Sequence, residues 1–479
     1  MTISKLHYIN VGPKGTFHKS GDVQTKPQDI DAIIEHIEQH GLKKIAIHLH
    51  GGLINEKSGM EIAEKMLPVY HNAKSHSIAI VWETGLLETI VQNLNTIYTT
   101  KLFKKLLMLV IRHAGNHLGL TSRRRGSANS IYYSDIEQNI NKDKPFDDFK
   151  FVPAKMRDET DLLSESKLKA LEQEIEDDIY LHIDEFKELL KEEALDTQLL
   201  DQSRISQETK EKRGVIAIIK AIVIIVTKVI KRYVHKTHHH FYPTVVEEIL
   251  RYFYLTDQGA WVWNGMKNAA VNMWLPNNNL TGLDQHAGTY LLDKLAALQR
   301  RKPDIAIDLI GHSAGSIAIC QMLKAAANYN LNLKIRHILF LAPACTADLF
   351  KSEIIDHPNR YQHFRMFTMR DDFECNDSLV KGLYTHSLLY FISGVLEDEV
   401  DKHILGMERY LSGKTPYDKA PYLAVKNYLQ QEGTNRIVLS NTEKITPNAE
   451  LGFCSTSETH GDFDDDPSTR DSLTHMIRE

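Results

Sequence analysis

The chain has 479 residues, a hydrophobic fraction of 42% and a formal net charge of −6 at pH 7. The length predicts two or three domains, or one domain with a large insertion. The hydrophobic fraction excludes a wholly disordered chain, and the mildly acidic balance argues against general binding of nucleic acids.

The four cysteines lie far apart and lack the Cys-x-x-Cys spacing of zinc ribbons and redox motifs. We therefore expect a reducing compartment, with neither a disulfide framework nor a structural zinc site. The first residues lack the pattern of a signal peptide, and no uncharged apolar run reaches the roughly 18 residues that a membrane span needs. The expected location is cytoplasmic, with a peripheral contact to a membrane left open.

The first part of the chain alternates strand and helix patterns. Residues 44–50 (KIAIHLH) are apolar and β-branched and end at Gly51-Gly52, which predicts a buried strand followed by a loop. Helical spacing follows over 58–70, and residues 77–83 (SIAIVWE) predict a second strand. This βαβ order indicates a parallel sheet with helices on its faces.

The middle of the chain, residues 116–258, has a different pattern. An acidic stretch contains apolar residues at helical spacing from Leu168 to Leu190, which predicts a long amphipathic helix. A basic stretch follows, and within it residues 214–230 are apolar on nearly all sides except at Lys220 and Lys228. We interpret this segment as a buried helix of a cap, or as a lid that contacts lipid.

The α/β pattern returns after residue 289. The expected strands cover 305–310, 337–341, 363–369 and 436–439, and the expected helices between them cover 289–300, 315–329 and 346–355.

The strongest motif is Gly311-His312-Ser313-Ala314-Gly315, which lies between a predicted buried strand and a predicted helix. This is the G-x-S-x-G pattern in the strand–turn–helix context of a nucleophile elbow. Two glycines leave room for neighbouring backbone, and the start of the helix favours a developing oxyanion. We expect Ser313 to be a nucleophile, and His312 to pack beside it or orient it.

A nucleophile of this kind needs two backbone N–H groups as an oxyanion hole. One is expected from Ala314, directly after the serine. The loop after the strand 44–50 is placed to supply the other, and there we expect Gly52, with Leu53 as its neighbour.

The general base is expected to be a histidine near the end of the chain. His460 is followed by a glycine in a predicted loop, which suits this role, and His475 is the alternative. The run His238-His239-His240 could suggest a metal site. Adjacent side chains on one element point in different directions, so we expect a solvated surface tract instead.

The acid that orients the histidine is expected after the strand 363–369. Asp372 is our first choice and Asp371 the alternative, because one carboxylate there can hold the imidazole N–H. Asp377 is a third candidate, although a helix-capping role is expected for it. Asp462 and Asp464–Asp466 lie near His460, where we expect them to order the loop or cap the last helix.

The order of oxyanion loop, Ser313, Asp372 and His460 resembles that of the α/β-hydrolase superfamily, in its serine esterase and lipase-like branch. The motifs IHLHGGL, LIGHSAGS and THGDFDDD carry this resemblance, across roughly residues 1–115 and 260–479. It implies a mainly parallel central sheet flanked by helices, in two core parts (1–115 and 259–479) separated by a large, mostly helical cap insertion (116–258).

The resemblance also implies hydrolysis of a carboxylic ester, with a lipid as one candidate, through an acyl-serine intermediate and without a metal or organic cofactor. The expected partner is a small-molecule or lipid ester, and residues 214–230 are expected to roof Ser313 and to contact a membrane surface. Two alternatives remain: a non-catalytic protein whose cap binds a partner or membrane, and a serine hydrolase that acts on amides or thioesters. Nothing in the sequence predicts the oligomeric state.

Overall fold

The structure is a computed structural model of the whole chain. It describes residues 3–52, 54–82, 87–122, 131–147, 149–151, 163–182, 184–185, 188, 210–253, 258–441 and 451–479.

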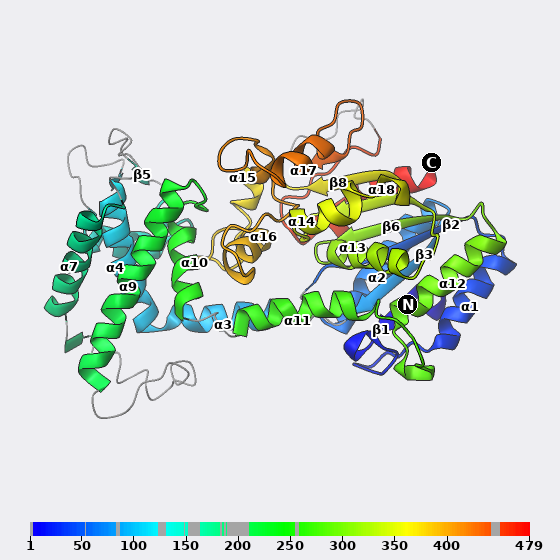
Figure 1. Cartoon of the computed structure of the whole chain (residues 1–479), viewed down its shortest axis with the longest axis horizontal. Coiled ribbons are helices and arrows are strands. Elements are labelled where there is room, and N and C mark those ends of the chain that lie inside the picture. The colour runs from blue at the N-terminus through cyan, green and yellow to red at the C-terminus, as the bar shows by residue number, and fades with distance from the viewer. Residues whose placement is uncertain are drawn as a thin grey trace.

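A seven-stranded sheet, parallel throughout, forms the centre of the larger part of the molecule (Figure 1). Its spatial order is β1-β3-β2-β6-β7-β8-β9. The strands are β1 (Tyr8–Val11), β2 (Lys44–Leu49), β3 (His76–Trp82), β6 (Ala306–His312), β7 (Ile335–Leu341), β8 (Tyr361–Thr368) and β9 (Ile437–Leu439). The expected fold class is confirmed.

Helices cover both faces of this sheet. On β2, Ile45 and Ile47 belong to a core on one face, while Ala46 faces a second core on the other. Because both faces are buried, the strands are continuously apolar rather than alternating. The helices around the sheet are α1 (Pro27–Gln39), α2 (Glu56–Asn72), α12 (Ala287–Arg301), α13 (Gly315–Asn328), α14 (Ala347–Phe350), α15 (Asp371–Glu374), α16 (Leu388–Phe391), α17 (Tyr422–Leu429) and α18 (Pro467–Arg478).

A second, mostly helical region lies at the opposite end of the molecule from α1 and α12 (Figure 1). There α9 packs against α4, α7 and α10. Helices α3 and α11 lie between this region and the sheet: α3 contacts α4, and α11 contacts α13. These elements are α3 (Leu87–Thr99), α4 (Lys101–Leu118), β4 (Leu120–Ser122), α5 (Tyr133–Ile140), β5 (Phe149–Phe151), α7 (Glu165–Leu181), α9 (Lys210–Val234), α10 (Phe241–Phe253) and α11 (Gln258–Asn272).

A buried network of ion pairs and hydrogen bonds joins the two regions. Arg232, at the end of α9, donates to Glu247 of α10 at 2.6 Å. His239 lies between Glu247 (2.8 Å) and Asp401 (3.0 Å), and Asp401 belongs to the part of the chain that packs on the sheet. Charged groups are rarely buried unless they are paired in this way, so this network fixes the helical region to the sheet region.

The same network corrects one expectation. The run His238–His240 is not a solvated surface tract, because His239 is fully buried and paired on both ring nitrogens. His238 stacks on Tyr233 with ring centroids 3.9 Å apart. His240 is exposed, but the run as a whole lies in the junction between two regions.

The observed strands and helices agree with those predicted from the sequence where the apolar runs are long. The short strand β1 and the antiparallel pair β4–β5 were missed, since runs of three or four residues carry little periodicity. The expectation that residues 214–230 roof Ser313 is wrong, because α9 packs on α4, α7 and α10, far from the sheet (Figure 1). Among the described residues, no helix is long and apolar enough to span a membrane.

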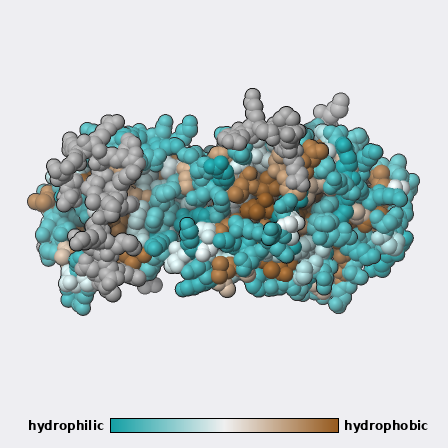
Figure 2. Space-filling view, turned by 90° about the horizontal axis from the view of Figure 1, so that it is seen from above, coloured by the Kyte–Doolittle hydropathy of each residue, from teal (hydrophilic) through white to brown (hydrophobic). Residues whose placement is uncertain are grey.

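Figure 2 shows where apolar side chains reach the surface on the face seen from above. They gather near the middle of the molecule's length, while the rest of that face is mostly hydrophilic. On α9 itself, Ile222, Ile225 and Val229 are fully buried, whereas Ile224 is 41% exposed. The apolar character of α9 therefore serves mainly the core of the helical region.

This burial gives a direct test on α9. Ile225→Ser should lower the free energy of unfolding by about 3–5 kcal/mol, because it removes a buried aliphatic group and leaves a hydroxyl to satisfy. Ile224→Ser, one residue away but exposed, should change it by less than about 1 kcal/mol. Urea denaturation of both variants measures the difference, and equal effects would contradict the burial of this helix face.

Candidate active site

A tight turn between β6 and α13 presents Ser313. Its backbone is left-handed, with φ of 48°, which is uncommon for a residue other than glycine. Neighbouring backbone holds this conformation: Ser313 N–H donates to the Leu341 carbonyl at 2.8 Å, and Ala344 N–H donates to the Ser313 carbonyl at 3.0 Å. The hydroxyl of Ser316 also donates to the Ser313 carbonyl, at 2.6 Å. The surroundings thus stabilise a strained turn at the carboxyl edge of the sheet.

The two glycines of the motif are required by close packing. A Cβ at position 315 would lie 2.1 Å from the carbonyl oxygen of Leu49, on the neighbouring strand. A Cβ at position 311 would lie 2.9 Å from backbone atoms of the following helix. Gly311 and Gly315 therefore let β2 and α13 approach the serine, as the motif predicts.

His460 lies beside Ser313. Its Nε2 is 2.9 Å from the Ser313 Oγ, although 147 positions separate the two residues. Burial, together with the positive charge of nearby His312, lowers the pKa of His460 to about 3. The ring is therefore neutral at pH 7, and its Nε2 lone pair can accept the serine proton. The structure brings these two expected site residues together.

A second histidine supports the loop that carries His460. His312 Nε2 donates to the His460 carbonyl at 3.0 Å, and its Nδ1 is 2.9 Å from Asp464 Oδ2. Burial alone would lower the pKa of His312, but the Asp464 carboxylate outweighs it and raises the pKa. In return His312 holds the pKa of Asp464 below its usual range despite burial. This pair fixes the position of the loop. The Asp464 carboxylate therefore contacts the His312 ring and not the His460 ring.

The expected acid does not reach the imidazole. Asp372 is exposed and forms an ion pair with Arg370, with N–O distances of 2.9 and 3.1 Å. Asp371 accepts a hydrogen bond from the Tyr390 hydroxyl at 2.7 Å. Both belong to the short helix α15, which begins three residues after the end of β8, and neither has a hydrogen bond to His460.

Asp377, the third candidate, is the carboxylate that contacts His460. Its Oδ2 accepts the His460 backbone N–H at 2.8 Å. Burial raises the pKa of Asp377, and the hydrogen bond from His460 partly offsets this rise. Nδ1 of His460 is buried and has no hydrogen-bond partner among the described residues. His460 thus has one carboxylate, that of Asp377, bound to its backbone, and one ring nitrogen, Nδ1, without a described partner.

The loop after β2 lies against the serine. A Cβ at Gly51 would contact Ser313 Cβ at 3.4 Å, and a Cβ at Gly52 would lie 2.8 Å from Ala314 Cβ and 2.2 Å from Met266 Sδ on α11. Neither the Gly52 nor the Ala314 N–H donates to another described group. Leu53, the other expected member of the oxyanion hole, lies outside the described residues.

His50 sets the direction of the Gly51–Gly52 peptide. Its Nε2 accepts the Trp82 N–H at 3.2 Å, so the proton of the neutral ring is on Nδ1, which donates to the Gly51 carbonyl at 2.7 Å. Burial lowers the pKa of His50 to about 4, which keeps this tautomer neutral. In a trans peptide the carbonyl and the next N–H point in opposite directions, so holding the Gly51 oxygen directs the Gly52 N–H the other way.

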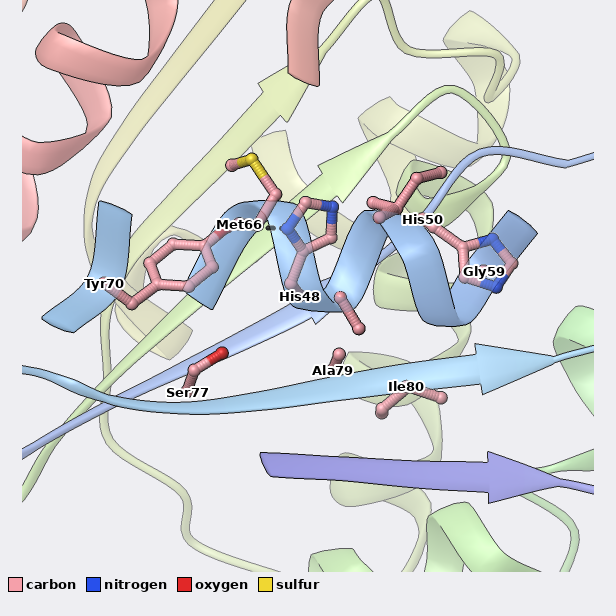
Figure 3. Close-up of a pocket in the computed structure, with 10 residues that line it drawn as sticks. His48, His50, Gly59, Met66, Tyr70, Ser77, Ala79 and Ile80 are labelled. Atoms are coloured by element: carbon pink, nitrogen blue, oxygen red, sulfur yellow. Dashed lines mark hydrogen bonds between the residues drawn. The ribbon is translucent and has the colours of Figure 1, made fainter. Parts of the chain in front are cut away.

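A narrow pocket lies behind this loop, between α2 and the strands β2 and β3 (Figure 3). Figure 3 shows His48 directed at Tyr70, and the Nδ1–Oη distance is 2.6 Å. The pocket has no room for a water molecule. It is therefore part of the support of the loop and not a substrate site.

Sequence reasoning named Asp377 only as a third candidate for the acid, with a helix-capping role expected, and it missed the His312–Asp464 pair. The motif THGDFDDD offered several aspartates near His460, and no spacing rule distinguishes one that binds a neighbouring histidine. Asp377 lies nine residues beyond the end of β8, so the rule that the acid follows the strand directly favoured Asp371 and Asp372.

Residues 285–381 match the family described as Alpha/beta hydrolase of unknown function (DUF900). The matched segment contains the turn at Ser313 and Asp377, and it ends before His460. No curated protein and no solved structure was found to match the chain.

Buried neutral histidines predict sensitivity to acid. Burial lowers the pKa of His50 to about 4 and that of His403 and His460 to about 3. In the unfolded chain these groups bind protons near pH 6.5. Below that pH the unfolded state holds more protons than the native state, so the free energy of unfolding falls as the pH falls.

The expected loss between pH 6.5 and 5 is at most about 2 kcal/mol for each such histidine. His312, whose pKa the Asp464 carboxylate raises, and carboxyl groups such as Glu374, whose pKa burial raises, act in the opposite direction. Urea unfolding at pH 7 and pH 5 measures the balance. A free energy of unfolding that is constant or higher at pH 5 would show that these rings are not held neutral.

Proposed function

We propose that this protein, a member of the α/β-hydrolase superfamily, is a serine hydrolase that cleaves a carboxylic ester through an acyl-serine intermediate on Ser313. The observation that carries the proposal is the 2.9 Å contact between Ser313 Oγ and His460 Nε2, at a strained strand-to-helix turn. A structural serine would need neither the left-handed backbone nor a buried neutral imidazole beside it.

In the first step, the neutral His460 ring takes the Ser313 proton as Oγ attacks the acyl carbonyl carbon. The carbonyl oxygen becomes an oxyanion, and the Gly52 and Ala314 N–H groups are available to hold it. The start of α13 adds a favourable dipole at the same place.

The imidazolium then gives its proton to the leaving alcohol, the C–O bond breaks, and the acyl group remains on Ser313. In the second step, His460 takes a proton from water as the water oxygen attacks the ester carbon of the acyl-enzyme. The carboxylic acid is released when Ser313 recovers its proton. The groups that perform each proton transfer belong to this chain.

Asp377 is the carboxylate proposed to stabilise the imidazolium. It already accepts the His460 backbone N–H. The assignment requires that the carboxylate also accept Nδ1–H when substrate is bound, and catalytic hydrogen bonds are often loose before substrate binds. The unpartnered Nδ1 supports this assignment, since a buried donor is costly unless it is paired.

The substrate class depends on the leaving group, which is an alcohol in an ester, a thiol in a thioester and an amine in an amide. Matched ester, thioester and amide substrates with the same acyl group compare the three directly, and a series of acyl lengths tests for a lipid substrate. The proposal expects the ester to be cleaved fastest. A preference for the amide or thioester would keep the serine mechanism and change the substrate class.

Ser313→Ala and His460→Ala should each lower kcat/KM for an activated ester on the order of 10⁴-fold or more, because the two groups act as a unit. The double variant should lose little beyond either single one. The assay is hydrolysis of a chromogenic ester, with folding checked by circular dichroism. His475→Ala, whose half-buried side chain on α18 lies beside Glu479, is the matched control and should retain activity.

Asp377→Asn should lower kcat on the order of 10²–10⁴-fold, because an amide cannot stabilise the imidazolium as a carboxylate does. Asp372→Asn should leave kcat unchanged, since Asp372 contacts Arg370 at the surface. Steady-state kinetics of the two variants separates the roles. If Asp372→Asn proves the more damaging, the acid assignment reverts to α15.

A further inference from the structure

Three side chains from separate segments meet near the junction of the two regions. His240 precedes α10, Cys375 follows α15, and His386 precedes α16. Their ligand atoms all lie within 4.8 Å of one another, and His240 Nδ1 is 2.9 Å from His386 Nε2. Among the described residues, this is the group that combines imidazole and thiol donors at such distances.

We propose that His240, Cys375 and His386 bind a zinc ion, with water as the fourth ligand. The site goes beyond the proposed hydrolase function, and it departs from the sequence-based expectation of no metal. Two imidazoles and a thiolate are donors that Zn²⁺ prefers, and three protein ligands with one open position form a recurring zinc arrangement.

The distances require only a small adjustment. Tetrahedral bonds of about 2.0–2.1 Å to nitrogen put two ligating nitrogens about 3.3 Å apart. The two imidazole nitrogens would therefore move apart by a few tenths of an ångström, and the sulfur would move inward. His240 has a left-handed backbone, with φ of 62°, directly before the start of α10.

Groups that could support the ligands are already in contact with them. His386 Nδ1 lies 3.4 Å from the Thr385 hydroxyl, so it can donate outward while Nε2 faces the metal. The Cys375 sulfur lies 3.7 Å from the Tyr390 hydroxyl, which in turn donates to Asp371 at 2.7 Å. Outer contacts of this kind orient metal ligands and tune their basicity.

The proton balance is simple. The contact between the two imidazoles uses one N–H and one lone pair, so one ring must change tautomer for both nitrogens to ligate. His240 can carry its proton on Nε2, because its side chain is exposed. The Cys375 thiol loses its proton to solvent, so binding of each ion releases one proton.

The ion would link the helical region to the loop that holds the base. His240 belongs to the helical region, and Cys375 lies two residues before Asp377, which binds the His460 N–H. Asp371 is the nearby carboxylate that favours a cation, and Arg409, which contacts Tyr390 at 3.5 Å, opposes it. The site would therefore act as a clamp across the junction.

The test uses tag-free Ser313→Ala protein, so the result does not depend on hydrolytic activity. After removal of metals with a chelator, Co²⁺ is added as a spectroscopic probe and Zn²⁺ as a competitor. We expect one equivalent of Co²⁺ to bind, with a thiolate-to-cobalt charge-transfer band and the intense visible bands of a tetrahedral site. One equivalent of Zn²⁺ should remove both signals and raise the Tm.

Cys375→Ser should abolish the charge-transfer band, and His386→Gln should weaken Zn²⁺ binding at least 10-fold. Cys454→Ser and exposed His357→Gln, outside the cluster, should bind as the parent does. Failure to bind Co²⁺, or a charge-transfer band that persists in Cys375→Ser, would overturn the proposal.

A second measurement covers variants that fail to fold. X-ray absorption of the zinc-loaded parent protein should show one sulfur and two imidazoles in the first coordination sphere. A shell of nitrogen and oxygen ligands alone would overturn the site even if every variant were unstable.

Discussion

The left-handed turn at Ser313 is the constraint on which the site depends. A residue with a side chain is held at φ of 48° because β7 and the segment after it bind its backbone on both sides. The turn has room only because position 315 carries no Cβ, which would collide with the Leu49 carbonyl. The same close approach brings the loop after β2 against the serine. Packing of two parallel strands thus positions both Ser313, the proposed nucleophile, and the amides proposed as its oxyanion donors.

Electrostatics around His460 explain why the proposed mechanism needs a carboxylate. In the resting structure burial and the neighbouring His312 lower the pKa of His460 to about 3, so the ring accepts a proton reluctantly. The reaction requires a transient imidazolium, and a base works best when its pKa lies near the operating pH. Asp464 cannot supply the full compensation, because it pairs with His312. A carboxylate at Nδ1 would raise the pKa during the reaction, and Asp377 is the one bound to this residue.

The fold and part of the site could be predicted from the sequence, for physical reasons. Apolar runs such as the one leading to Ser313 are short and rich in β-branched residues, which favours buried strands of a parallel sheet. G-x-S-x-G between a strand and a helix is specific in that context. His460, the proposed base, could be found by its place in chain order. Asp377 could be named only as a third candidate for the acid, because hydrogen bonding to a backbone N–H 83 positions away leaves no local pattern. The packing position of α9 could not be predicted either, since a helix buried against other helices and a helix that roofs a site have the same composition.

The most direct test of the central claim is covalent labelling. A fluorophosphonate probe reacts with a serine only when the serine is activated as a nucleophile, and peptide mapping identifies the labelled residue. We predict labelling at Ser313 in the parent protein, none in Ser313→Ala, and strongly slowed labelling in His460→Ala. A folded parent protein that stays unlabelled, or a label that persists in Ser313→Ala, would contradict the account.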